Sequence, residues 1–347
     1  MNNQERVDYY TANLNKEWNI TFCENTEICN YDCNGINLTY VEQSNPKCYP
    51  IFYINKDFSV NHFDKLWWNK YEKIKHDKKL GRKCVWKAVN GWNKRDFIEP
   101  LIKLFKSDNY FKNYGFLHRP GDVVYNTTIP IITKTRPIEK INTLNNVIIN
   151  LDADRHWYTP LSQVKNKDIP FNQKNDKIIW RGAANGFLYH PTRPSRLTLC
   201  KKYYKHSNPM IDIGFVNDYE DLVGKGKINI EDQLKSKFLI SVEGGDVATN
   251  LKWILYSNST TLMAKPTMAS WLMEDKLEPW VHYVPLDNDF SDLEEKYNWC
   301  LNNIDKCEEI AKNGKLYIEQ FLDKEREAKI TNLVLRKYVD YVKVKLI

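Results

Sequence analysis

The stretch KFLISVEGGDVATNLKWILYSNSTTLMAKP, residues 237–266, decides the fold of this chain. Residues 238–242 have the pattern of a buried strand and run into the sequence EGGD at 243–246. A helix is expected next, over 249–257. Because glycine has no Cβ, a glycine pair between a strand and a helix lets the backbone approach a ligand closely.

The turn after this strand is suited to hold a phosphate group. Thr249, Asn250 and Lys252 lie in the opening turns of the expected helix. The N–H groups and the dipole of a helix N-terminus favour an anion, and Lys252 adds a full positive charge. The spacing matches neither the phosphate-loop motif nor the dinucleotide fingerprint. From the residues alone, a ligand loop and an ordinary strand–turn–helix corner are therefore both open.

Strands and helices alternate through the second half of the chain. Ser291 with Glu294 predicts a capping box, Gly314 predicts the C′ position of a helix, and a last amphipathic helix is expected over 325–342. Strands that alternate with helices at this pitch indicate a parallel sheet covered on both faces. The expected strands are 178–180, 210–215, 238–242, 260–264 and 281–285, and the expected helices between them are 195–204 and 249–257.

The first half of the chain has a weaker pattern. Residues 1–60 are polar and are expected to form an irregular N-terminal extension. Helical spacing predicts helices over 62–75 and 95–107, where Pro100 lies in a first turn or marks a kink. Short strands are expected at 114–118, 129–133 and 147–151.

Composition indicates a globular protein. A hydrophobic share of 42% and an aromatic share of 13% argue against a disordered chain. The net charge of +7 is spread along the sequence, which favours a solvated basic surface over a dedicated nucleic-acid stripe. The charge therefore gives little support to a nucleic-acid-binding protein.

Several motifs resemble glycosyltransferase family 90, which holds capsule-associated and lipopolysaccharide-modifying sugar transferases and the eukaryotic protein O-glucosyltransferases. VEGGDVATNLKWILYSNS followed by EPWVHYVPL is similar to the central signature of that family. Further matches come in order upstream: PIITKTRPI at 130–138, DRHW at 154–157 and IIWRGAANG at 178–186. The similarity spans roughly residues 115–322 and is closer to the bacterial and viral branch than to the animal branch.

The resemblance implies the GT-B architecture, in which two Rossmann-like α/β domains face a central cleft. The expected domains are an N-terminal extension over 1–60 and an acceptor-side domain over 61–172. A nucleotide-sugar-binding domain is expected over 173–322, and a C-terminal helix over 323–347 that packs back on the first domain.

In the O-glucosyltransferases of this family, an arginine–glycine pair after a strand and an arginine near the next helix contact the donor. These positions correspond here to Arg181, Gly182 and Arg196, whereas Arg193 has a weaker case. Arginine suits phosphate because its planar fork gives two parallel charged hydrogen bonds. Where the family commonly has another arginine, this chain has Asn250, and pairing of the arginines with surface carboxylates is the alternative. The residues expected to bind a UDP-sugar are Arg181, Gly182, Arg196, Glu243, Gly244, Gly245, Asp246, Asn250 and Lys252.

Asp122, in HRPGDVVYN, is expected to be the catalytic base. Eukaryotic relatives place their catalytic aspartate just before a segment ending in Ser-Lys-Thr, and residues 133–135 are Thr-Lys-Thr here. The intervening loop is shorter in this chain, and an aspartate beside glycine is also common turn chemistry. Asp154 and Asp246 are the reserve candidates.

Four further residues are expected in or near the cleft: Lys134, Arg136, His156 and Trp271. Each has a plainer alternative. Lys134 and Arg136 suit a structural role equally well, and His156 suits a buried hydrogen-bonded position. Trp271 shares a family-like segment with Glu274, but most of the eleven tryptophans must be core.

The chain is therefore expected to be an inverting, metal-independent glycosyltransferase. It would move a hexose or pentose, glucose or xylose first, from a UDP-sugar to a hydroxyl of a glycan, lipopolysaccharide or protein. No cofactor and no metal are expected, because Asp152 and Asp154 have the spacing of an acidic metal pair but lie in a segment that the family uses otherwise. The alternative is a non-catalytic sugar- or nucleotide-binding protein that keeps the fold.

A cytoplasmic location is expected, in the host cytoplasm if the source is viral. The N-terminus has no apolar core of a signal peptide, and no window reaches the roughly 18 apolar residues of a membrane span. A piece that lacks its native targeting sequence is the alternative. In a reducing compartment the eight cysteines are expected as free thiols, with a disulfide-linked cap as the alternative. A zinc site is not expected, because the early cysteines lack the paired C-x-x-C spacing.

Overall fold

The computed structural model divides the chain into two compact units. Unit 1 contains Met1–Leu151 and Glu325–Ile347, and unit 2 contains Asp152–Lys324. The helix expected over 62–75 lies outside the described residues. The described residues are 1–11, 14–22, 29–33, 36–40, 52–54, 60–62, 99–119, 121–122, 129–139, 145–151, 154–186 and 193–346.

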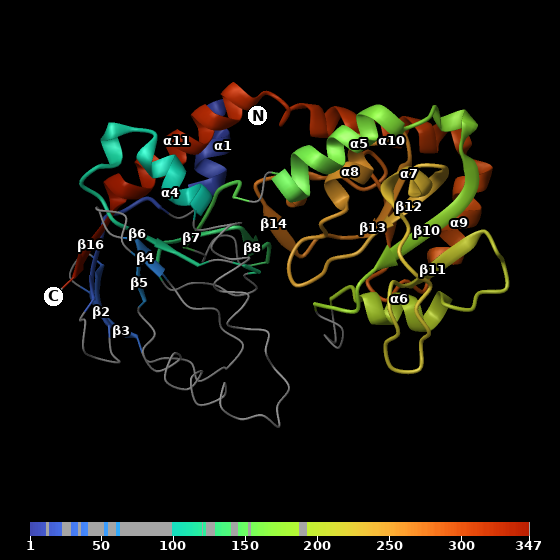
Figure 1. The fold of residues 1–347 in the computed structure, drawn as a ribbon, viewed down its shortest axis with the longest axis horizontal. Helices are drawn as coiled ribbons and strands as arrows, with labels where there is room; N and C mark the ends of the chain where they lie inside the picture. Colours follow the sequence, from blue (N-terminus) through green and yellow to red (C-terminus); the bar gives the residue numbers. More distant parts are fainter. Residues whose placement is uncertain are drawn as a thin grey trace. The chain divides into compact units, whose positions relative to one another are not determined.

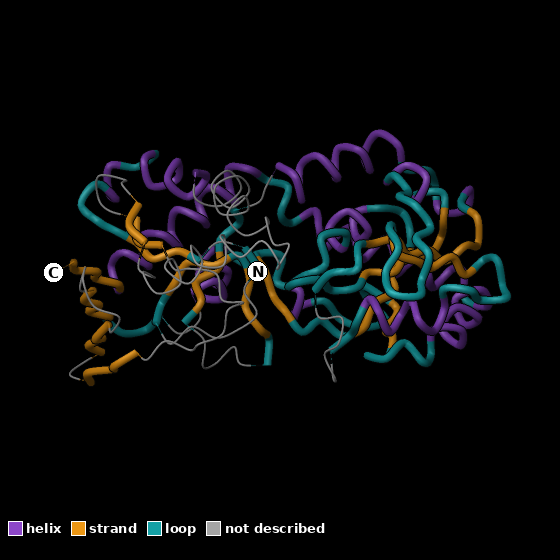
Figure 2. Tube along the Cα trace, turned by 60° about the horizontal axis from the view of Figure 1, so that its bottom comes forward, coloured by secondary structure: helices purple, strands orange, loops and turns teal. Residues whose placement is uncertain are grey.

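Unit 2 is built on a parallel sheet, which confirms the predicted α/β class (Figure 1). The spatial order of its strands is β11-β10-β12-β13-β15. In the turned view of Figure 2 the strands of this unit lie among its helices. The strands are β10 (Asn175–Gly182), β11 (Ile211–Phe215), β12 (Ser236–Ser241), β13 (Thr260–Ala264) and β15 (Val284–Leu286).

The two faces of β12 pack against different helices. Phe238 and Ile240 belong to one hydrophobic cluster with Leu197 of α6 (Arg196–Tyr203) and Tyr297 of α9 (Leu293–Asn302). Because side chains alternate along a strand, Leu239 points to the other face, where α8 (Leu251–Tyr256) packs against β12. Both faces are therefore buried, which explains why this strand reads as a continuous apolar run.

The strand order contains a reversal between β10 and β12. β11 follows β10 in the chain but lies on the far side of β10 from β12. The connection after β10 carries α6 and the connection after β12 carries α8, and Figure 1 shows these helices on opposite sides of the sheet. In open parallel sheets ligands bind at such a reversal, beyond the carboxyl ends of the strands. The RGAANG and VEGGD segments both start there.

Two predicted helix ends are wrong. The N-cap of α9 is Asp292, because the Ser291 hydroxyl donates to Asp289 Oδ1 at 2.8 Å instead of capping the helix. α10 (Ile304–Glu319) continues through Gly314. A Cβ at Gly314 would lie 3.0 Å from Leu255 Cδ2, so this glycine allows close packing of α10 on α8 and does not end the helix.

Unit 2 has further short elements around its sheet. The π-helix η5 leads directly into α5, and the single-turn η6 precedes β10. Farther along the chain, α7 lies between β11 and β12, and η7 lies between β14 and β15. Their bounds are η5 (Asp154–Tyr158), α5 (Thr159–Lys167), η6 (Phe171–Gln173), α7 (Ile230–Gln233), β14 (Met268–Ser270) and η7 (Glu274–Lys276).

Unit 1 contains two sheets, in the orders β16-β1-β2-β3 and β5-β4-β6-β7-β9. Its helices are α1 (Asn3–Thr11), α4 (Glu99–Lys106), η3 (Asn109–Phe111) and α11 (Lys324–Tyr341). Its strands are β1 (Trp18–Phe22), β2 (Cys29–Cys33), β3 (Ile36–Tyr40), β4 (Phe52–Ile54), β5 (Val60–His62), β6 (Phe116–His118), β7 (Ile131–Thr133), β8 (Thr135–Pro137), β9 (Asn146–Ile148) and β16 (Val342–Leu346).

The expectation of an irregular extension over 1–60 is wrong for its described part, which holds α1 and β1 to β4. The reason is pairing with the other end of the chain. β1 runs parallel to β16, with Trp18 opposite Val342. The fully buried Arg6 of α1 also forms an ion pair with Glu327 of α11. A local sequence pattern does not reveal partners more than 300 residues away.

No described helix is both long and apolar enough to cross a membrane. Cys200, Cys300 and Cys307 are buried free thiols, which confirms that expectation for these three residues.

His118, at the end of β6, is expected to make unit 1 sensitive to acid. Its ring is fully buried with Nδ1 2.9 Å from the carbonyl oxygen of Ile132, and burial lowers the pKa of His118 from 6.5 to about 4. The unfolded chain therefore binds this proton near pH 6.5, whereas the folded chain does not until about pH 4. The contribution of neutral His118 to the free energy of unfolding is therefore fully present above pH 6.5 and is lost as the pH falls from 6.5 to about 4.

The expected loss is about 2 kcal/mol by pH 5 and about 3 kcal/mol by pH 4. Urea unfolding of wild type and His118→Gln across this range measures it. Because other groups titrate equally in both proteins, the difference between their pH slopes isolates His118. Parallel slopes would contradict the prediction.

Candidate functional site

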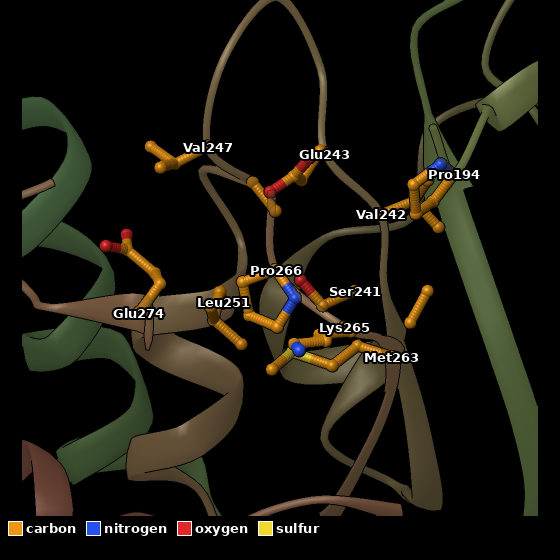
Figure 3. Close-up of a pocket in the computed structure, with 12 residues that line it drawn as sticks. Pro194, Ser241, Val242, Glu243, Val247, Leu251, Met263, Lys265, Pro266 and Glu274 are labelled. Carbon is orange, nitrogen blue, oxygen red and sulfur yellow. The ribbon is translucent and has the colours of Figure 1, made fainter. Parts of the chain in front are cut away.

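A pocket opens at the carboxyl ends of β12 and β13 in unit 2. The empty space at this pocket is about 340 Å³, a volume that includes open solvent at its mouth. Figure 3 shows two carboxylates, Glu243 and Glu274, well apart from each other, with Leu251 and Pro266 in the lower centre of the view. Most of the wall is apolar, as in many small-molecule sites. The lining residues are Pro194, Ser241, Val242, Glu243, Val247, Ala248, Leu251, Met263, Ala264, Lys265, Pro266 and Glu274.

Beside the pocket the two glycine-containing loops touch each other. Gly186, in the loop after β10, has φ +87°, and a Cβ on it would lie 2.1 Å from the carbonyl oxygen of Gly244. A side chain at position 186 would thus overlap the backbone of the loop after β12. Glycine is required here both for its left-handed conformation and for this close approach.

Arg196, the first residue of α6, connects the same two loops. Its guanidinium donates to the carbonyl oxygen of Ala183 at 3.2 Å, to Asn185 Oδ1, and to the carbonyl oxygen of Val242 at 3.3 Å. A Cβ on Gly244 would lie 2.8 Å from Arg196 Nη2. The second glycine loop therefore leaves room for this guanidinium, at the sheet reversal where a ligand is expected.

Glu243 joins three segments around the pocket. Its carboxylate accepts hydrogen bonds from the backbone N–H groups of Thr267 and Met268, at 2.8 and 3.0 Å, and from the Thr267 hydroxyl. It also forms an ion pair with Arg193 at 2.9 Å. We call this arrangement of Glu243, Arg193, Thr267 and Met268 the Glu243 clasp.

Arg181 lies in β10 and turns toward the neighbouring strand β11. Its guanidinium pairs with Asp212 at 2.5 Å and donates to the carbonyl oxygens of Trp180 and Asp212. Burial alone would raise the pKa of Asp212. Hydrogen bonds from Lys177 and Arg181 outweigh this effect and lower the pKa of Asp212 to about 2. Arg181 therefore pairs with a carboxylate of the protein, which was the alternative to phosphate binding in the sequence analysis.

Lys252, in the first turn of α8, is buried, and its ammonium lies 5.8 Å from the ring centre of Trp271. Glu274 is also fully buried and accepts hydrogen bonds from the backbone N–H and hydroxyl of Ser270, at 2.6 and 2.7 Å. Burial raises the pKa of Glu274, and the positive charge of Lys252 acts in the opposite direction. The positive charge of Lys252 thus partly offsets the cost of burying the Glu274 carboxylate.

The remaining candidates of the VEGGD segment contribute to its local structure. Asn250 occupies the N-cap position of α8, where its amide donates to the carbonyl oxygen of Ile240 and accepts from the hydroxyl of Ser241. Asp246 is buried, and its carbonyl oxygen accepts the N–H of Gly244 at 3.2 Å. Both residues hold the turn together.

The candidates of unit 1 divide into one ion pair and one buried side chain. Asp122 has a side chain that is 46% exposed and forms an ion pair with Lys134 at 2.8 Å. Arg136 is fully buried, donates to the carbonyl oxygen of Tyr9 at 2.6 Å and stacks on its ring. Arg136 therefore anchors α1, in agreement with its structural alternative.

Asp154 and His156 lie in η5 of unit 2, where His156 is half-buried. Trp271 is buried and packs edge-on against Trp157 with ring centres 4.7 Å apart. Within the ranges that the structure describes, no three His, Cys, Asp or Glu side chains gather as a metal site would require.

The structure thus brings Arg193, Arg196, Glu243 and Gly244 together at the pocket or beside it. The pocket lining that the structure describes includes neither Arg181 nor Lys252. Sequence reasoning did not single out Asn185, Thr267 or Met268. Asn185 lies inside a quoted motif, so its polar side chain was a usable signal. Met268 acts through its backbone N–H, which leaves no trace in sequence, and Thr267 acts through both its backbone N–H and its hydroxyl.

More than half of the chain matches the profile of a known protein family. The profile described as Glycosyl transferase family 90 matches residues 149–347, more than half of the chain and all of the loops just described. The chain is 35% identical over 220 residues to the O-glucosyltransferase LpsA of Dichelobacter nodosus, covering 63% of this chain and 64% of that protein.

Two more distant relatives match about half of the chain. The uncharacterized protein 035R of Invertebrate iridescent virus 3 is 29% identical over 174 residues, which is 45% of this chain and 16% of that protein. Protein O-glucosyltransferase 3 of Homo sapiens is 29% identical over 174 residues, which is 48% of this chain and 32% of that protein. The chain spans less than two thirds of the length of each of these relatives. With the profile match across unit 2 and the resemblance of the motifs confirmed, the chain belongs to glycosyltransferase family 90.

Proposed function

We propose that this protein is a glycosyltransferase that moves a hexose or pentose from a UDP-sugar to a hydroxyl of a glycan, lipopolysaccharide or protein. Glucose and xylose are the first donors to test. The observation that carries the proposal is the close approach of Gly186 to Gly244 at the sheet reversal, beside a pocket and next to the guanidinium of Arg196. The names of two relatives, both O-glucosyltransferases, support the same reaction class.

Sugar transfer from a nucleotide requires that the leaving diphosphate be held and its charge neutralised. We assign this role first to Arg196, because the loops that it connects meet at the carboxyl ends of β10 and β12. Arg193, held by Glu243 at the pocket, is the second cation. Arg181 and Lys252 remain part of the proposal only if their carboxylate partners release them on binding. With guanidinium groups in this role, the reaction is proposed to need no metal and no cofactor.

The acceptor hydroxyl must lose a proton as it attacks, and a single base with no covalent intermediate gives inversion. Asp122 remains the proposed base, because its carboxylate is 46% exposed and can be reached by an acceptor. The GT-B arrangement of the two units is part of the same proposal.

Asp122→Asn is expected to reduce turnover by about 10²- to 10⁴-fold, the usual contribution of a general base. A UDP-release assay over a panel of UDP-sugars, with and without EDTA, measures this, and wild-type turnover is expected to be unchanged by EDTA. Asp232→Asn is the control, because it removes an exposed carboxylate paired with Lys235.

Full turnover by Asp122→Asn would reassign the base to Asp154 or Asp246. Loss of wild-type turnover on chelation would contradict metal independence. A wild type that binds UDP but turns over no sugar in the panel would favour the non-catalytic binding protein.

A further inference from the structure

Glu243 was expected to contact the donor, but its carboxylate is occupied by the protein. An ionised carboxylate offers two oxygens with about four lone-pair sites. Four donors from described residues fill them, namely two backbone N–H groups, the Thr267 hydroxyl and the Arg193 guanidinium. The side chain is 12% exposed, which leaves little surface for a ligand.

The clasp joins three separate segments at the pocket. Glu243 follows β12, Thr267 and Met268 follow β13, and Arg193 precedes α6. Each segment also supplies lining residues, among them Pro194, Val242 and Pro266. One carboxylate therefore fixes the relative positions of all three segments.

We infer that Glu243 is a positioning residue for the donor site: it fixes the Arg193 guanidinium and the backbone of 265–268 around the pocket without binding the donor itself. This inference rests on the proposed function. Without the carboxylate, Arg193 loses its ion-pair partner and two backbone N–H groups lose their acceptor. The three segments would then have to be ordered during binding, which weakens affinity.

A positioning residue that does not touch the reacting atoms should affect donor binding more than the chemical step. Glu243→Gln keeps the size of the side chain and removes its charge. UDP affinity of the full chain, measured by calorimetry, is expected to fall about 10- to 100-fold, the scale of losing hydrogen bonds to a charged group. The KM for the donor should rise in parallel, with kcat and the acceptor KM within about twofold. Glu308→Gln, which removes an exposed partner of Lys312 on α10, is the matched control and should bind UDP as wild type does.

A double-mutant cycle with Arg193→Gln tests the route of the effect. If Glu243 acts by holding Arg193, the double variant should bind UDP no more weakly than the weaker single variant. Fully additive losses would overturn the inference, because Glu243 would then act without Arg193. If Glu243→Gln does not fold, Thr267→Val removes only one donor to the carboxylate and should weaken UDP binding about twofold to fivefold.

The possible failures are distinguishable. A wild type that binds UDP while Glu243→Gln or Thr267→Val binds equally well overturns this inference and leaves the proposed function intact. A wild type that does not bind UDP overturns both.

Discussion

Lys252→Met is expected to lower the free energy of unfolding by about 3–5 kcal/mol, the usual cost of leaving one partner of a buried charge pair alone. Lys252 and Glu274 are both buried in unit 2, and the ammonium opposes the effect of burial on the carboxylate. Removing Lys252 raises the pKa of Glu274 further, so the folded state holds a proton that the unfolded state releases. The loss of stability should therefore be largest above neutral pH and smaller in acid.

Chemical denaturation at several pH values measures this effect. Lys312→Met, which removes an exposed lysine paired with Glu308, is the control and should change stability by less than about 0.5 kcal/mol. The double variant Lys252→Met/Glu274→Gln should recover most of the loss, because no buried charge remains unpaired. A Lys252→Met protein of normal stability that no longer binds UDP would instead favour the phosphate role expected from the sequence.

Gly186→Ala is expected to abolish tight UDP binding and to cost about 2–4 kcal/mol of stability, from backbone strain and steric overlap together. The added Cβ would lie 2.1 Å from the carbonyl oxygen of Gly244 and 2.7 Å from the backbone nitrogen of Gly245. Backbone atoms cannot rotate away as a flexible side chain can, so the two loops must separate.

Gly226 provides a matched control for this variant. It has a similar φ of +77°, but a Cβ placed there has nothing within 4 Å. Gly226→Ala should therefore show the strain of a left-handed alanine, about 1 kcal/mol, with normal UDP affinity. Equal effects of the two variants, measured by calorimetry and thermal unfolding, would contradict a functional contact between the loops.

Much of unit 2 was predictable because its signals are local. The apolar run at 238–242, the glycines after it and the apolar face of α8 identify a strand–turn–helix unit from neighbouring residues alone. The predicted capping box at Ser291 is wrong because the Ser291 hydroxyl donates its hydrogen bond to Asp289, two residues away. Gly314 failed as a helix end because its role depends on Leu255, which lies on another helix.

The sequence by itself determined the alternation of strands and helices, the family, and the two glycine loops where a ligand is proposed to bind. Only the tertiary structure decided which partners the charged residues have, because the sequence gives the sign of each charge but not the residue that lies next to it in the fold. Arg181 forms an ion pair with Asp212 and Arg193 with Glu243, each between separate segments, and the charge of the buried Lys252 acts on the buried Glu274. For the same reason the first residues of the chain were misread, since β1 is stabilised by pairing with β16 at the opposite end of the chain.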